Sequence, residues 1–197
     1  MLTKSERTRL HIIEKASHLF NQKGFYGTSM SDIMEVTGLA KGGVYGNFES
    51  KEEILLESFD HSFRKVADEI VFKIKSTDNA IDKLNAIVDY YYNYHENSPT
   101  EGGCPVLNYS RHMDNSIPQL TKAINKAIKV MLDTIVRIIE KGQKYHQIKK
   151  QIKPSMAADI IYSRLEGTLM LTKALNDNAK LSLLLDDIKN YIKELKA

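Results

Sequence analysis

Polar side chains that suit binding to a phosphate backbone gather near the N-terminus, over residues 28–51. Hydroxyls come first, at Thr28 and Ser29, and lysines follow at Lys41 and Lys51. Hydroxyls and backbone N–H groups at a helix start can donate to a phosphate, and lysines neutralise its charge. The segment is therefore a candidate for binding nucleic acid.

Two short helices with a turn between them would position these side chains. Ser29 and Asp32 have the spacing of an N-terminal capping box, and Gly38 ends the helix about two turns later. A second short helix follows from Lys41. This arrangement predicts a helix-turn-helix, in which the second helix enters the major groove of DNA.

The second helix carries the residues expected to read the duplex. Gly42 and Gly43 remove side-chain bulk at its start, so the helix can approach DNA closely. Tyr45 and Asn47 offer a phenol and an amide to phosphates or bases. The plainer alternatives are a packed ring for Tyr45 and a solvated charge for Lys41 and Lys51. The predicted DNA-binding set is Thr28, Ser29, Lys41, Gly42, Gly43, Tyr45, Asn47 and Lys51.

Helical spacing of apolar residues recurs along the whole chain, which predicts an all-α protein of about nine helices. Three of them would form a helix-turn-helix DNA-binding domain over residues 1–50. Residues 51–197 would form a helical ligand-sensing and dimerisation domain. Pro105, Pro118 and Pro154 suit the first turn of a helix, and one helix is expected to run to about His95.

Composition sets broad limits on the function. Of the 197 residues, 42% are hydrophobic and 27% are charged, as in ordinary globular proteins, and a net charge of +3 permits DNA binding without demonstrating it. The longest apolar run is too short to span a membrane. The single cysteine, Cys104, cannot form an internal disulfide and suits a reducing compartment. We therefore expect a cytoplasmic protein that does not contact membranes.

Arrangements typical of enzymes and metal sites do not occur in the sequence. The six histidines are scattered, and none forms an i, i+4 pair of the kind that binds metal on a helix. The glycines of residues 38–46 do not follow a strand, as those of a phosphate-binding loop would. The sequence thus predicts a protein that is not an enzyme and that needs neither a metal nor a cofactor.

The second short helix and its flanks carry a specific motif. Its residues are Lys41-Gly42-Gly43-Val44-Tyr45-Gly46-Asn47-Phe48, followed by Ser50-Lys51-Glu52-Glu53, with Gly27-Thr28-Ser29 upstream. With this spacing, residues 6–55 resemble the DNA-binding domain of the TetR (tetracycline-repressor-type) regulators. The resemblance implies a two-domain α protein, a dimer formed by the last two helices, and repression relieved by a small ligand.

By the same resemblance, four residues correspond to the usual DNA-contacting positions: Thr28, Lys41, Tyr45 and Lys51. Gly46 and Asn47 depart from the family pattern, because many relatives have larger, aromatic or histidine side chains there. The resemblance therefore assigns no base readout to these two positions.

Residues that could line a ligand pocket occur within residues 51–197. Interior tyrosines need hydrogen-bond partners, which a ligand can supply, and methionines suit an adaptable apolar pocket. Cys104 precedes a predicted helix and is either a reactive thiol or a packing residue. Plain core packing is the alternative for the others. The candidates are Phe59, Phe63, Tyr91, Cys104, Met113 and Met131, and they favour a small hydrophobic effector.

The last two predicted helices have wide apolar stripes, which favour a four-helix dimer interface. Gly167 would permit a close helix crossing. An internal cover for the core is the alternative. The predicted interface residues are Ile161, Leu165, Leu169, Leu184, Leu185, Ile188, Tyr191 and Ile192.

Together these patterns predict a ligand-responsive transcription regulator. It would bind a palindromic operator in double-stranded DNA as a homodimer, and a small effector would release it. Two alternatives stay open, namely an activator on the same fold and a ligand-binding protein that acts through a protein partner.

Overall fold

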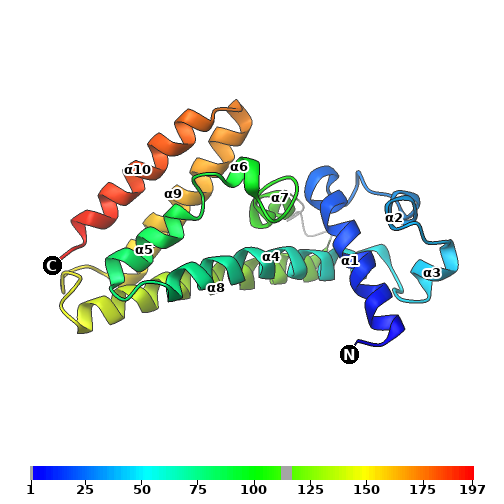
Figure 1. Ribbon diagram of the computed structural model, residues 1–197, viewed down its shortest axis with the longest axis horizontal. Coiled ribbons are helices and arrows are strands. Elements are labelled where there is room, and N and C mark those ends of the chain that lie inside the picture. Colours follow the sequence, from blue (N-terminus) through cyan, green and yellow to red (C-terminus); the bar gives the residue numbers. More distant parts are fainter. Residues whose placement is uncertain (1, 112–116) are drawn as a thin grey trace. The chain divides into compact units, whose positions relative to one another are not determined.

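The structure is a computed structural model, and it describes residues 2–111 and 117–197. Over these residues it is helical, apart from one isolated antiparallel bridge between Ile148 and Lys196, which confirms the predicted all-α class. The helices are α1 (Lys4–Lys23), α2 (Met30–Thr37), α3 (Lys41–Tyr45), α4 (Lys51–Lys75), α5 (Ala80–Asp89), α6 (Tyr94–Asn97), α7 (Pro105–Ser110), α8 (Pro118–Lys144), α9 (Pro154–Leu175) and α10 (Asn178–Glu194) (Figure 1).

Local sequence signals determine where the helices begin. Thr3 with Glu6 and Ser29 with Asp32 form complete capping boxes at α1 and α2. Asn79 caps α5 with its side chain, which accepts a hydrogen bond from a backbone N–H of the first turn. Prolines stand at the start of three helices, as predicted: α7, α8 and α9. Gly38 is left-handed (φ 67°, ψ 16°) and ends α2.

One predicted helix is interrupted in the structure. The helix expected to continue to His95 ends at Asp89, and a turn over residues 90–93 separates it from α6. The rings of Tyr90, Tyr91 and Tyr94 contact one another at this turn, with centroids 4.9–5.5 Å apart. Tyr91 and Tyr94 are buried. Burial of adjacent aromatic rings thus competes with helix continuity, and the described residues form ten helices instead of about nine.

Contacts within the chain define two compact units. The first unit comprises residues 1–66 and 99–127, and the second comprises residues 67–98 and 128–197. Both α4 and α8 continue from one unit into the other. The first unit therefore contains the predicted DNA-binding segment together with the first 16 of the 25 residues of α4, all of α7 and the start of α8.

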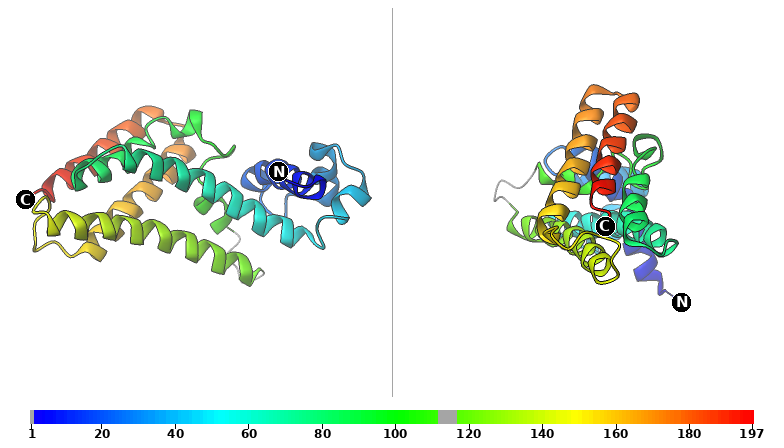
Figure 2. Two further views of the ribbon diagram at one scale, coloured as in Figure 1. Left: turned by 60° about the horizontal axis from the view of Figure 1, so that its bottom comes forward. Right: turned by 90° about the vertical axis from the view of Figure 1, so that its left-hand side faces the viewer.

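Each unit has its own apolar core. In the first unit α1 packs on α2, and Ile12, Ile33, Val44 and Phe48 are buried. In the second unit α9 and α10 run side by side, and α10 also contacts α5 (Figure 2).

Candidate nucleic-acid interface

The two short helices of the predicted helix-turn-helix are present in the structure. A tight connection through Gly38, Leu39 and Ala40 joins α2 to α3. Val44 is fully buried and Phe48 is 2% exposed, so both side chains anchor α3 on the first unit. The opposite face of α3 is consequently directed toward solvent.

The solvent face of α3 carries the side chains suited to DNA. Lys41 and Tyr45 are exposed, with Tyr45 at 45%, and the Lys41 ammonium lies 5.7 Å from the centre of the Tyr45 ring. Gly42 lies between them in sequence and is exposed as well. This face can present a cation, a phenol and exposed peptide backbone to the phosphates of DNA.

Gly46 is needed to end this short helix. A methyl group added at Gly46 would lie 2.8 Å from the Gly42 carbonyl oxygen, which accepts the Gly46 N–H bond at 3.0 Å. A larger side chain would therefore disturb the last turn of α3. At Gly42 an added methyl group would meet nothing within 4 Å, so a side chain there would extend into solvent.

The start of α2 is less open to a phosphate than the sequence suggested. The Thr28 side chain is buried and its hydroxyl donates to the Gly24 carbonyl oxygen at 2.8 Å. The Asp32 carboxylate accepts from the Ser29 N–H at 2.7 Å. Hydrogen bonds from Ser29 hold the pKa of Asp32 below its usual value, with a smaller contribution from Lys23. A carboxylate that stays ionised at this helix start competes with an incoming phosphate.

Lys51 ties the connection between α1 and α2 to α4. Its ammonium donates to the carbonyl oxygens of Phe25 and Thr28, both at 2.9 Å, and lies 4.0 Å from the centre of the Phe25 ring. These contacts use two of its three N–H donors. The side chain thus has a structural role, and one donor is left for a phosphate.

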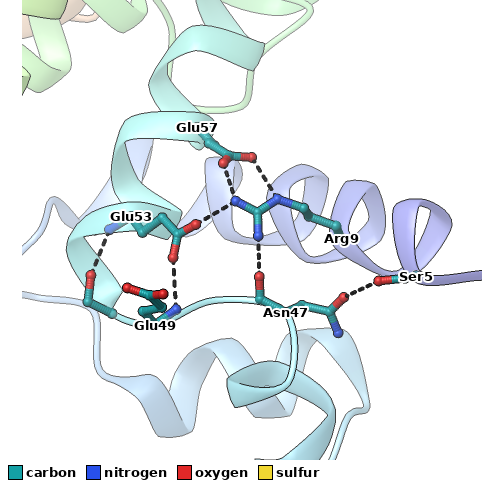
Figure 3. A network of polar contacts seen from close by, with 7 residues as sticks. Ser5, Arg9, Asn47, Glu49, Glu53 and Glu57 are labelled. Carbon is teal, nitrogen blue, oxygen red and sulfur yellow. Dashed lines mark hydrogen bonds and ion pairs between the residues drawn. The ribbon is translucent and has the colours of Figure 1, made fainter.

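Arg9 on α1 joins three parts of the first unit (Figure 3). Its guanidinium donates to the Asn47 carbonyl oxygen after α3, and to Glu53 at 2.6 Å and Glu57 on α4. It also lies over the Phe48 ring at 4.0 Å. The bond from Arg9 lowers the pKa of Glu53, as does the Glu49 N–H. Arg9 therefore fixes the end of α3 against α1 and α4.

The Asn47 side chain is engaged within the protein. Its amide nitrogen donates to the Gly43 carbonyl oxygen at 2.8 Å, and its amide oxygen accepts from the Ser5 hydroxyl at 3.2 Å. Sequence reasoning assigned this amide to DNA and did not identify the role of Arg9. The partners of Arg9 lie 38 to 48 residues away in the chain, so no local pattern could reveal them.

A second buried polar network connects α1 to the loop that precedes α7. The Asn21 amide nitrogen donates to the carbonyl oxygens of Glu101 (2.6 Å) and Gly103 (2.9 Å). The Asn108 amide nitrogen donates to the Asn21 side-chain oxygen (3.1 Å) and to the Gly102 carbonyl oxygen (2.7 Å). The network ties the helix that supports the helix-turn-helix to α7.

The candidate ligand-binding residues fall in different units. Phe59 and Phe63 stack at 6.3 Å in the first unit, and the Phe59 ring lies 5.2 Å from that of Tyr109. The buried Cys104 belongs to the same unit. Tyr91 and Met131 are buried in the second unit. Met113 lies outside the described residues.

Buried polar groups occur on α4 within three residues of Phe59. Ser58 and Ser62 are fully buried, and the Ser58 hydroxyl and the His61 Nε2 atom have no hydrogen-bond partner among the described residues. Burial raises the pKa of the nearby Tyr109 hydroxyl and lowers that of His61, chiefly by desolvation. Such groups usually require partners in an interior, which sequence periodicity alone did not indicate.

Most of the predicted dimer residues are buried within the single chain. Leu184 and Tyr191 are partly exposed, and six others are at most 2% exposed: Ile161, Leu165, Leu169, Leu185, Ile188 and Ile192. These six form the core between α9, α10 and their neighbours, which corresponds to the alternative of an internal cover. The outward face of α9 carries different residues, including Met156 at 52% and Met170 at 59% exposure.

Within residues 2–111 and 117–197, every helix is too short or too polar to span a lipid bilayer. The same residues contain no group of three acidic, histidine or cysteine side chains placed to hold a metal ion.

Comparisons with known proteins agree with this geometry. Residues 12–58 match the family profile "Bacterial regulatory proteins, tetR family", and residues 80–187 match "Tetracyclin repressor-like, C-terminal domain". A TetR regulator structure from Chloroflexus aurantiacus is 31% identical, with a TM-score of 0.94, over 99% of this chain and 98% of that one. A second, from Cytophaga hutchinsonii, is 30% identical, with a TM-score of 0.94, over 100% and 98% of the two chains. The Escherichia coli repressor NemR is 22% identical over 94% of both chains.

Proposed function

Because the chain belongs to the TetR family of transcriptional regulators, we propose that it is a repressor that binds a palindromic operator as a homodimer and is released by a small effector. It acts in the cytoplasm, where bacterial DNA lies. Family membership also makes it a regulator and not an enzyme. The observation that carries the proposal is the solvent face of α3, where Lys41 and Tyr45 are exposed on a helix anchored by Val44 and Phe48.

Lys41 and Tyr45 are the primary DNA contacts in this proposal, with Gly42 and Gly43 admitting the backbone closely. Lys51 adds a contact through its remaining donor. Thr28, Ser29 and Asn47 rank lower, because their polar side-chain atoms already have partners in the protein.

The experiment compares Lys41→Ala and Tyr45→Ala with the parent protein. Fluorescence anisotropy would measure binding to the promoter regions of the protein's own gene and of neighbouring genes. We expect each variant to bind about tenfold more weakly or worse, because a charged or polar phosphate contact contributes roughly 1–3 kcal/mol. Lys41→Ala should also reduce the slope of log K against log salt concentration by about one, because one phosphate is no longer neutralised.

Matched controls are Lys129→Ala and Tyr145→Ala, which change an exposed lysine and an exposed tyrosine of the second unit. Both should bind DNA like the parent. If Lys41→Ala and Tyr45→Ala also bind like the parent, then α3 is not the recognition helix and the proposed interface is incorrect.

The proposed dimer uses the outward face of α9. Its residues recur at alternating spacings of four and three: Met156, Ile160, Ser163, Gly167, Met170 and Ala174. Small side chains at three of these positions let a second helix approach closely, while the flanking methionines bury apolar area. On α10 the 68% exposed Leu183 extends this surface. The two α3 helices of such a dimer would read successive major grooves about 34 Å apart.

The proposed effector is small and largely hydrophobic, with at least one hydrogen-bonding group. Phe59, Phe63 and Tyr109 supply an aromatic surface on α4 and α7. On the same helix, the buried Ser58 hydroxyl and the His61 Nε2 atom can accept or donate bonds to a polar group. An effector there would act on α4, which begins directly after the recognition helix.

A further inference from the structure

A groove of about 410 Å³ lies in the second unit, between the start of α5 and the C-terminal part of α8. Its volume is within the range of pockets that hold small molecules, about 300–1,000 Å³. It shares no residue with the proposed DNA contacts or with the aromatic surface around Phe59. The proposed function therefore does not account for it.

The walls of the groove are fixed by backbone contacts. The Gln147 side-chain oxygen accepts the Ala80 N–H bond at 2.8 Å, which joins the turn after α8 to α5. A methyl group added at Gly142 would lie 2.6 Å from the Ala80 Cβ atom, so α8 and α5 approach as closely as a glycine permits. Lys83 donates to the Ile74 carbonyl oxygen at 3.0 Å. A preformed site of this kind requires little ordering when a ligand binds.

Positive charge dominates the lining. The lining contains three cationic side chains, those of Lys83, Arg137 and Lys141, and one carboxylate, that of Asp78. Arg137 and Lys141 are exposed, one turn apart on α8, and neither has an ion-pair partner among residues 2–111 and 117–197. Two like charges at this spacing disfavour a helix by a few tenths of a kcal/mol. Elsewhere in the unit, by contrast, Arg164 and Lys189 each pair with an aspartate.

The floor of the groove is apolar. Ile138 is 7% exposed and Ala80 is 4% exposed, and both contribute to the lining. The Tyr145 ring, 57% exposed, stands at the side. A cationic wall above an apolar floor matches a molecule with one anionic end and one apolar end.

We propose that this groove binds a small organic anion. Its carboxylate or phosphate group lies between Arg137 and Lys141, and its short apolar part lies on Ile138 and Ala80. Arg137 donates in a fork that matches either headgroup, and Lys141 adds a second cation. Binding here does not depend on operator recognition, so the two proposals can fail independently.

The test uses three probes that separate charge from apolar surface: hexanoate, 1-hexanol and inorganic phosphate. Two-dimensional amide NMR of the full-length protein would follow the Gln147 side-chain amide and the backbone amides of residues 78–83 and 134–147. We expect saturable shifts with hexanoate. Each of the other two probes should bind at least tenfold more weakly, because each lacks one of the two kinds of contact.

Substitutions then locate the headgroup. The double variant Arg137→Gln with Lys141→Gln should bind hexanoate at least tenfold more weakly than the parent. The charge-matched control Lys129→Gln with Lys150→Gln changes two exposed lysines outside the groove and should bind like the parent.

Three results would overturn the proposal. The first is the absence of saturable shifts at the lining with hexanoate. The second is equal hexanoate binding by the Arg137/Lys141 variant and the parent, which would mean that the cations are simply solvated. The third is phosphate or 1-hexanol binding as tightly as hexanoate, which would contradict the need for both charge and apolar surface.

Discussion

Arg9 illustrates how one side chain can hold the end of α3 in place through contacts within the protein. Its guanidinium reaches Asn47 at the end of α3 and Glu53 and Glu57 on α4, while its plane covers Phe48. About two thirds of the side chain is shielded from solvent, since 32% is exposed. Multiple hydrogen bonds to one planar group give a fixed geometry that a single surface ion pair lacks.

We predict that Arg9→Ala destabilises the protein by about 2 kcal/mol. The substitution removes several charge-assisted bonds and leaves Glu53 and Glu57 as adjacent like charges. Arg9→Lys should recover part of the loss, because a lysine keeps the charge but not the fork. Urea unfolding at one fixed protein concentration would measure both effects.

The control for this prediction is Arg64→Ala, which removes an exposed ion pair with Asp60 whose arginine is 73% exposed. Its loss should change the free energy of unfolding by less than about 0.5 kcal/mol. Similar midpoints for Arg9→Ala and Arg64→Ala would show that the Arg9 network adds no stability.

At the residue scale, sequence patterns predicted exposure better than partners. The exposed faces of Lys41 and Tyr45 and the burial of Val44 and Phe48 follow from helical spacing. The internal bonds of Lys51 and Asn47 do not, because exposed lysines and asparagines look alike in sequence whether or not a carbonyl oxygen lies within reach.

At the scale of elements, the Asn21–Asn108 network determines how α1 is held on the loop before α7. Four hydrogen bonds pass through two amides in a region where both side chains are at least 94% buried. Removing Asn21 takes the donor from the Glu101 carbonyl oxygen, and removing Asn108 takes the donors from the Gly102 carbonyl oxygen and the buried Asn21 side chain. An acceptor left without its donor costs more than the bond itself contributes.

We predict that Asn21→Ala and Asn108→Ala each destabilise the protein by about 1–3 kcal/mol and that their effects are not additive, with a coupling energy of roughly 1 kcal/mol or more. Asn21→Asp should be at least as harmful as Asn21→Ala, because it directs oxygens toward the carbonyl oxygens of Glu101 and Gly103. Chemical unfolding of the single and double variants would measure these energies.

The neighbouring Gln22 provides the comparison. Its amide donates to the Glu101 side chain at 3.1 Å on the exposed side of α1. Gln22→Ala combined with Asn108→Ala should be additive within about 0.5 kcal/mol. Additivity in the Asn21/Asn108 pair as well would show that the two amides do not act as one unit.

Helix bounds were largely predictable, since capping boxes and prolines act through residues three or four positions apart. The turn over residues 90–93 was not, because it depends on contacts among tyrosine rings in three dimensions. An apolar stripe likewise does not reveal whether its partner is the same chain or another copy, so the sequence alone could not show that six of the eight predicted dimer residues are buried within one chain.

At the scale of the whole molecule, the proposed dimer is the assumption on which operator binding depends. We predict that Met170→Glu shifts the protein toward a monomer and weakens operator binding about a hundredfold or more. In a dimer the second recognition helix binds at a high effective concentration once the first is bound, and a monomer lacks this gain. Analytical ultracentrifugation and anisotropy would measure the two effects.

Phe72→Glu is a suitable control, because Phe72 is 77% exposed on α4, away from α9 and α10 in sequence. It should leave both the mass and the affinity unchanged. A dimeric Met170→Glu protein, or a monomeric Phe72→Glu protein, would require another interface.

The continuity of α4 and α8 through both contact units has a practical consequence for chimeric regulators. A recognition head transplanted by a cut at residue 50 would lose all of α4, including the 16 residues that belong to the first unit, and with them Glu53 and Glu57, as well as Asn108. A fusion should retain these partners if it carries residues 99–127 together with the head. The junctions would then lie within α4 and α8, and each must keep the helical register of the two joined segments. The useful unit for engineering is thus discontinuous in sequence.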